Sequence, residues 1–159
     1  MTKASWQLPQ LLVAVSLGAL GFPSPGTSVV PIGATTQGNL GFGQIVATTV
    51  AGTVTVSPVG SRTSSGGVLL GNGLGVSAAT FAVIGEPNAS FSITLPTPCT
   101  LSSGGSSMTL DSFTSHPNGS GNLGPAGSQS VTLGATLHVG AAQAAAAYSG
   151  SYNVTVAYN

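Results

Sequence analysis

Apolar and small polar residues alternate along this chain from about residue 40 to its end, and this pattern limits the possible folds most strongly. The longest run, over 131–139, places Val131, Leu133, Ala135, Leu137 and Val139 on one face. The last nine residues place Tyr152, Val154, Val156 and Tyr158 on one face. A period of two is typical of a half-buried β-strand. We expect the last strand to reach the C-terminus, where another molecule can supply its next neighbour.

Shorter alternating runs separated by Gly, Pro and Asn predict further strands. They cover residues 40–46, 53–56, 67–70, 79–83, 91–95 and 108–113. A turn at 86–89 predicts that 79–83 and 91–95 pair as a hairpin. Phe113 is one position out of phase, which predicts a β-bulge or a turn near residues 111–112. The alanine-rich segment 141–147 is expected to be a connection. The pattern predicts an all-β, immunoglobulin-like sandwich of about seven to eight strands.

Charged residues are very rare, and this excludes whole classes of partner. Asp, Glu, Lys and Arg make up 3% of the 159 residues, whereas soluble domains carry about a quarter. The chain therefore has no basic stripe for nucleic acid and none for an anionic membrane surface. A nearly neutral surface also repels copies of itself weakly, so it tolerates close packing between them.

The N-terminal region has a different composition from the rest. Lys3 precedes a short apolar run over 11–20, and Gly and Pro follow, which predicts a secretory signal peptide over 1–26. The run is too short for a comfortable membrane span, so no membrane insertion is expected after the signal is removed. Cleavage can follow Gly21 or Gly26, and the alternative interpretation is an uncleaved signal anchor. We expect a secreted or cell-surface protein that passes through the periplasm, with its sandwich domain over 39–159.

Residues 27–38, between the signal peptide and the sandwich, allow two interpretations. Val30, Ile32 and Ala34 alternate there, whereas Pro31 is incompatible with a central ladder position but acceptable in an edge or inserted strand. The first interpretation is an N-terminal arm that adds a strand to a neighbouring subunit. The second is a flexible linker or the first strand of the same domain.

Groups capable of catalysis or metal binding are few and scattered. Cys99 is the only cysteine, so it cannot form an intrachain disulfide, and it fits best as a small packed hydrophobe. His116, Asp111 and one of the many serines do not make a meaningful triad, because no Gly-x-Ser-x-Gly elbow accompanies them. His138 falls on the polar face of its strand, and Glu86 is not at ligand spacing from any of them. We expect no enzymatic activity, no cofactor and no metal.

Six blocks of sequence resemble a known family. They are LGFGQIV at 40–46, TVTVSPVGSRTSSGGVLL at 53–70, SAATFAVIGEPNASFSITLP at 77–96, SSMTLDSFTS at 106–115, VTLGATLHVGAAQ at 131–143 and SGSYNVTVAYN at 149–159. In this order they resemble a bacterial secreted family known as domain of unknown function 4402. That family is similar to the archaic chaperone-usher pilins, the spore-coat-U-like subunits. Such pilins end in a Gly-x-Tyr turn and an alternating strand, here with Gly150, Tyr152 and Tyr158.

The resemblance implies an exported subunit that lacks one strand of its sandwich. A periplasmic chaperone would hold it, an outer-membrane usher would assemble it, and the arm of the next subunit would complete it. In that scheme Val30, Ile32 and Ala34 are the donor-strand side chains, and Tyr152, Val154, Val156 and Tyr158 line the acceptor edge. Pilins of this kind commonly carry a disulfide, which Cys99 alone cannot make.

Two functions are therefore considered. The first is a structural subunit of a fimbrium-like filament, pilus or coat, which polymerises with copies of itself by donor-strand exchange. The second is a monomeric secreted module for adhesion or glycan binding through loops such as 116–127. A glycan-binding loop is expected to cluster aromatic residues, but Phe42, Phe81 and Phe91 fall within the predicted strands. This placement favours the structural subunit.

Overall fold

The computed structural model describes residues 30–72 and 74–159. The predicted signal peptide and the first residues of the predicted arm lie outside the described residues. Within them every regular element is a strand, which confirms the all-β prediction. The strands are β1 (Gly33–Gly38), β2 (Gly41–Phe42), β3 (Ile45–Val56), β4 (Arg62–Leu70), β5 (Val76–Ser77), β6 (Ala79–Ile84), β7 (Ser90–Thr94), β8 (Cys99–Ser103), β9 (Ser106–His116), β10 (Ser120–Asn122), β11 (Ser128–Val139) and β12 (Thr155–Tyr158).

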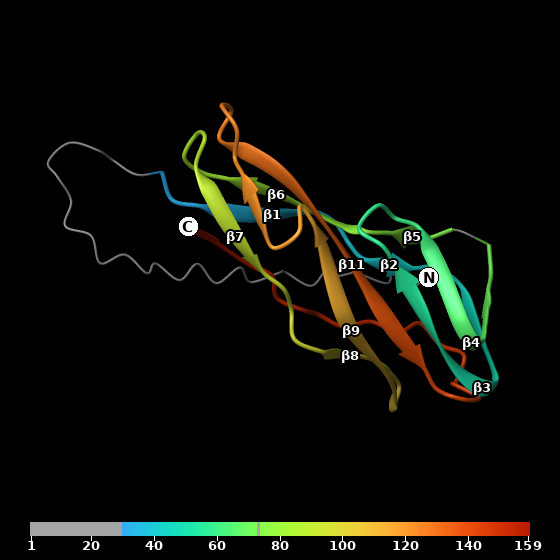
Figure 1. The fold of residues 1–159 in the computed structure, drawn as a ribbon. Coiled ribbons are helices and arrows are strands. Elements are labelled where there is room, and N and C mark those ends of the chain that lie inside the picture. The colour runs from blue at the N-terminus through green and yellow to red at the C-terminus, as the bar shows by residue number, and fades with distance from the viewer. Residues whose placement is uncertain (1–29, 73) are drawn as a thin grey trace, which may run out of the picture.

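Strand β11 is the centre of the larger sheet (Figure 1). One of its sides pairs with β9, and β9 pairs with β8. Its other side pairs with β6 through residues 128–133 and with β3 through residues 135–139. Strand β1 continues the sheet beyond β6, and β4 continues it beyond β3. A second sheet has the order β10-β7-β12, and β2 and β5 form a small two-stranded sheet.

The pairing order of the described strands corresponds to six of the seven strands of an immunoglobulin sandwich. Seven-stranded immunoglobulin domains have one sheet with the order ABED and another with the order CFG. Here β1-β6-β11-β9 takes the order A-B-E-D, and β7-β12 takes the order C-F. The β3–β4 hairpin is inserted between A and B. No described residue pairs beside β12 in the position of strand G.

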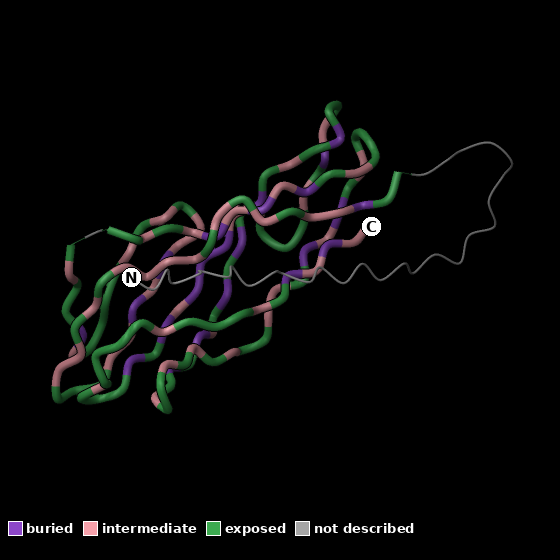
Figure 2. Tube along the Cα trace, turned by 180° about the vertical axis from the view of Figure 1, so that it is seen from behind, coloured by how far each residue is buried: buried purple, intermediate pink, exposed green. Residues whose placement is uncertain are grey.

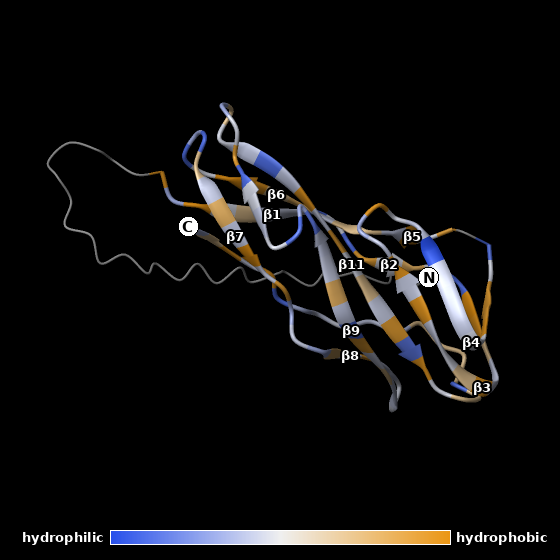
Figure 3. Ribbon diagram, in the orientation of Figure 1, coloured by the Kyte–Doolittle hydropathy of each residue, from blue (hydrophilic) through white to orange (hydrophobic). Residues whose placement is uncertain are grey.

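The core lies between the two sheets and is built from the alternating faces of the strands (Figure 2). Bands of hydrophobic and hydrophilic residues follow one another along β9 and β11 (Figure 3). In β11 every apolar residue of the 131–139 run is buried, as the sequence predicts. The largest completely buried side chains are those of Phe91, Leu110, Leu123 and Leu133. The apolar side chains of this chain are thus used mainly to join the two layers.

Two local predictions are confirmed. The register of β9 against β11 shifts between Gly134 and Thr136, and Ser112 has a φ of 50°, so a bulge lies where Phe113 leaves the phase of Met108. The bulge returns Phe113 to the buried face, where it is 8% exposed. Residues 141–147 contain no helix and connect β11 to the C-terminal segment.

One pairing prediction is wrong. The segments 79–83 and 91–95 do not form a hairpin, because β6 pairs with β1 and β11, whereas β7 pairs with β10 and β12. The turn between them does lie at 86–89, with Asn88 at a positive φ of 61°. It carries the chain from one sheet to the other. Phe81 and Phe91 therefore join the same core from different sheets, rather than lying side by side in one.

The end of the predicted arm forms strand β1. Gly33–Gly38 pairs antiparallel with β6, from Gly33 opposite Ile84 to Gly38 opposite Thr80. The domain's own sheet thus includes residues 33–38, before the predicted start of the sandwich at residue 39. In this chain the segment is the first strand of the domain, as in the second interpretation given above.

Candidate strand-acceptor groove

The predicted acceptor edge is strand β12 together with the segment that leads into it. Val154 and Val156 are 7% and 5% exposed and belong to the core, whereas Tyr152 and Tyr158 are half-buried against it. All four therefore share the face that the sequence predicts. In the described residues β12 pairs only with β7, from Thr155 opposite Thr94 to Tyr158 opposite Phe91.

The backbone of β12 directs alternate residues toward its unpaired side. The Asn159 N–H donates to the Ser90 carbonyl oxygen at 3.2 Å. In an antiparallel pair the residues that bond to the partner strand alternate with residues that do not. Residues 155, 157 and 159 therefore face β7, and Val156 and Tyr158 present their N–H and C=O groups outward. These groups can form a ladder with one further strand.

A groove of about 600 Å³ opens between the C-terminal segment and the first strands. One wall comes from Thr36 at the end of β1 and from residues 39–43, which include β2. The opposite wall comes from residues 146–152, and the floor includes Phe81, Leu110 and Leu137 of the larger sheet. Because this floor is apolar, an apolar side chain that enters the groove reaches the hydrophobic core directly.

Two side chains of the groove carry polar atoms at buried positions. The Thr36 hydroxyl oxygen is buried and has no hydrogen-bond partner among the described residues. The Tyr152 ring packs on Phe113 with ring centroids 5.3 Å apart. Burial raises the pKa of Tyr152 to about 12, and the negative charge that Cys99 can carry adds to this effect. A hydrogen bond with the Leu40 backbone acts in the opposite direction and lowers the pKa, but it does not outweigh them. The Tyr152 hydroxyl therefore stays protonated, and an occupant of the groove meets neutral polar groups.

The donor-strand residues lie just before and at the start of the chain's own first strand, and they are not among the residues that line the groove. Ile32 is 7% exposed in the core, Ala34 packs against the core opposite Val83, and Val30 is 46% exposed. In this chain these side chains are seated against their own domain. A donor role for them therefore requires β1 to separate from β6.

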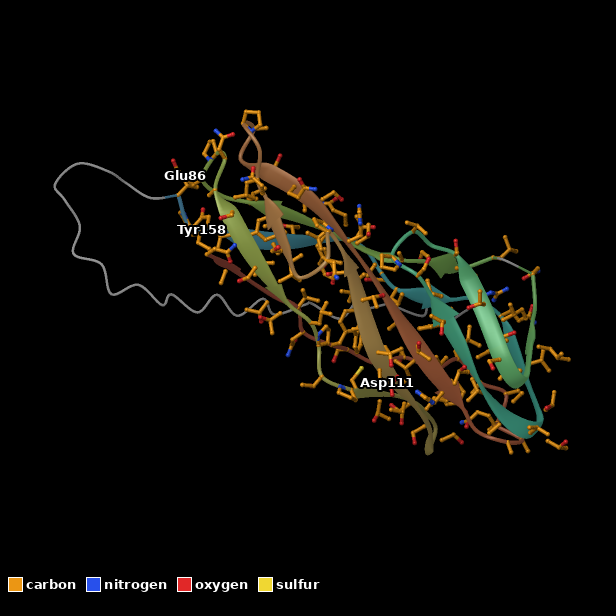
Figure 4. The ribbon with its side chains drawn as sticks, in the orientation of Figure 1. Glu86, Asp111 and Tyr158 are labelled. Carbon is orange, nitrogen blue, oxygen red and sulfur yellow. The ribbon has the colours of Figure 1, made fainter. Side chains whose placement is uncertain are left out.

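Tyr158 connects β12 to the beginning of the described chain (Figure 4). Its hydroxyl donates to the Val30 carbonyl oxygen at 2.6 Å and accepts from the Glu86 N–H at 2.6 Å. The Glu86 carboxylate accepts from the Val30 N–H at 3.2 Å. Gly85 makes this approach possible, because a Cβ at this position would collide with the Tyr158 hydroxyl. The role of Glu86 in this contact was not predicted from the sequence, although Glu86 is one of only two acidic residues in the chain.

The other charged residues of the described chain form contacts that join neighbouring strands and loops. Arg62 donates to the carbonyl oxygens of Phe42 (2.8 Å), Gln44 (3.0 Å) and Gly71 (2.8 Å), and so joins β4 to the segments around β2. Asp111 pairs with His138 at 2.9 Å between β9 and β11. Hydrogen bonds from His138 and then Ser112 hold the pKa of Asp111 below its ordinary value. His138 is thus half exposed, as expected from the polar face, and also has an acidic partner.

The remaining candidate groups do not come together. Cys99 lies on β8, and burial raises the pKa of its thiol. His116 is at the end of β9, and no three His, Cys, Asp or Glu side chains converge on a metal-sized site within the described residues. In the same part of the chain no helix is long and apolar enough to cross a membrane.

Comparison with known proteins gives one match. A search of curated proteins found none, and a search of solved structures also found none. The family model described as "Domain of unknown function (DUF4402)" matches residues 32–158. This match begins at the residue before β1 and ends at the last residue of β12, so it covers the whole strand assembly. The chain therefore belongs to the DUF4402 family.

Proposed function

We propose that this protein is an exported structural subunit of a surface filament, pilus or coat, and that its copies join by donor-strand exchange. The observation that carries the proposal is the outer edge of β12, which pairs with no strand within residues 30–72 and 74–159 and lies beside the position that strand G takes in an immunoglobulin sandwich. The proposal also draws on the resemblance of the C-terminal region to chaperone-usher pilins, which end in a Gly-x-Tyr turn and an alternating strand, here with Gly150, Tyr152 and Tyr158.

Donor-strand exchange would satisfy two physical needs of this edge. Unpaired N–H and C=O groups are costly when they are buried, and an open edge invites uncontrolled aggregation. A strand from another copy would complete the ladder along Val156 and Tyr158. A continuation of the same strand along residues 146–152 would bring its side chains to the apolar groove. Recognition of this kind derives affinity from backbone hydrogen bonds and register from alternate side chains.

The donor in this proposal is the segment that contains Val30, Ile32 and Ala34. Their spacing of two residues matches a strand that directs every second side chain into a groove. Until exchange takes place, the open edge needs protection, which is the role of a periplasmic chaperone, and an outer-membrane usher would then order the assembly. The scarcity of charge fits close contact between identical copies.

The test compares the chain from residue 27 with a truncated chain from residue 39, by size-exclusion chromatography and electron microscopy. The longer chain is expected to form heat-resistant oligomers or fibres. The truncated chain is expected to remain monomeric and to be stabilised by a peptide spanning 29–38, with slower amide exchange at Val156 and Tyr158 of β12. Slower exchange along β6 alone would mean that the peptide only refills the position of β1. The matched control peptide carries Ile32→Ser and Ala34→Ser. Since the truncated chain can accept a strand but cannot donate one, adding it to the longer chain should shorten the fibres.

Two results would contradict the proposal. If both chains are equally stable monomers, no strand is exchanged, and the alternative of a monomeric adhesion or glycan-binding module replaces it. If the longer chain forms fibres whose length the truncated chain does not change, the copies join through another surface.

A further inference from the structure

Strand β1 is attached to its own domain mainly through backbone pairing. Its sequence is Gly-Ala-Thr-Thr-Gln-Gly, and of the side chains around it Ile32 is buried and Ala34 is partly buried against the core. Only β6 pairs with it among the described strands, so β1 is an edge strand. Edge segments with few buried apolar contacts open more readily than central strands. A polar contact at the residues that precede β1 therefore adds to the burial of Ile32 in keeping β1 in place.

Such a contact exists immediately before β1 and involves both ends of the sandwich. We name the hydrogen-bonded set of Val30, Glu86 and Tyr158 the Tyr158 latch. The Tyr158 hydroxyl and the Glu86 carboxylate together bond both backbone groups of Val30. Tyr158 is at the same time a residue of β12, whose outer edge is unpaired. The strand that would leave and the edge that would receive a donor are thus linked by one hydroxyl group.

We infer that the Tyr158 latch controls strand exchange by holding β1 in its own domain. This inference rests on the proposed function. While the latch is closed, Val30 is hydrogen-bonded to Tyr158 at the end of β12, and the donor segment stays paired with β6 of its own domain. When the latch opens, β1 loses its tether, and Tyr158 is free to face an incoming strand. The partner that the freed segment fits is a second copy of this chain.

The test removes the hydroxyl and retains the ring, with Tyr158→Phe in the chain from residue 27. Both hydrogen bonds of the hydroxyl are lost, and each net hydrogen bond corresponds to about a fivefold change in an equilibrium. Amide hydrogen exchange of residues 33–38 is therefore expected to accelerate by about tenfold or more, and assembly of the purified monomer is expected to be faster. Gly85→Ala places a methyl group where the Tyr158 hydroxyl lies, so it should also accelerate exchange over 33–38 and assembly.

The matched control is Ser92→Ala. The Ser92 hydroxyl donates to the Ala157 carbonyl oxygen at 3.3 Å, so this variant also removes a side-chain hydrogen bond to β12 but leaves Val30 untouched. Its exchange over 33–38 and its assembly rate should equal those of the unmodified chain. A Ser92→Ala variant that behaves like Tyr158→Phe would overturn the inference, because any loosening of β12 would then be sufficient.

The two readouts separate this inference from the function on which it rests. Unchanged exchange over 33–38 in Tyr158→Phe and Gly85→Ala overturns the latch, even if fibres form. Faster exchange combined with faster assembly supports both. Faster exchange in a protein that never assembles shows that the latch holds β1, and refutes the filament.

Discussion

Replacing Val156 by alanine is expected to destabilise the domain, because Val156 packs β12 against the hydrophobic core. Val156 is 5% exposed in the core and lies opposite Ile93 of β7. The substitution removes two methyl groups, each worth about 0.8 kcal/mol of transfer free energy. The cavity that remains adds to this cost, so the free energy of unfolding should fall by about 2–3 kcal/mol. That is a large fraction of the ~5–15 kcal/mol that stabilises a typical domain.

The measurement is urea unfolding of the isolated monomer, followed by far-ultraviolet circular dichroism. The midpoint should fall while the dependence on urea stays the same, because the substitution changes stability and not the surface exposed on unfolding. Two protein concentrations are needed, since association would add apparent stability. The control is Ala157→Ser, on the other side of the strand, which should change the free energy by less than about 0.5 kcal/mol. An equally small effect of Val156→Ala would refute the packing of β12 against the core.

Three further substitutions test other parts of the structure. Arg62→Lys keeps the charge but loses the planar fork that bonds three carbonyl groups, so it should lower the free energy of unfolding by about 2 kcal/mol in urea unfolding; an unchanged midpoint would contradict this role. Asp111→Asn should be less stable than the unmodified chain at neutral pH. Because the pKa of Asp111 is lowered in the folded state, the difference should shrink as the pH falls below about 4, and a difference independent of pH would exclude the pair with His138. Gly134→Ala places a Cβ against the backbone at the end of β3, so it should lower the free energy of unfolding by about 3 kcal/mol or prevent folding. Gly33→Ala is the control and should be tolerated, because a Cβ there makes only ordinary van der Waals contact with Ile84; soluble yield and urea unfolding distinguish the two variants.

Strand positions and faces were predictable from the sequence because the side-chain period of a strand is local. The 131–139 run and the Tyr152–Tyr158 run fall on the faces that their alternation predicts, and the bulge at Ser112 follows from the phase of Phe113. The pairing of these strands was not predictable in the same way. A period of two identifies the buried face of a strand, but it carries no information about which strand lies beside it. The turn at 86–89 predicted that β6 and β7 pair as a hairpin, but the two strands lie in different sheets.

Some features of the candidate site also follow from local sequence, whereas others depend on the order of the strands. The amino-acid sequence alone determined the all-β class, the turn at 86–89, the buried face of β12 and the scarcity of charge, because each depends on residue type and local spacing. Tertiary structure decided that β12 pairs with only β7 among the described strands and that a groove opens beside Tyr152. It also decided that Val30, Glu86 and Tyr158 meet, although 128 residues separate the first from the last. These features depend on the order of strands across the sheets, and that order is set by the packing of the whole core.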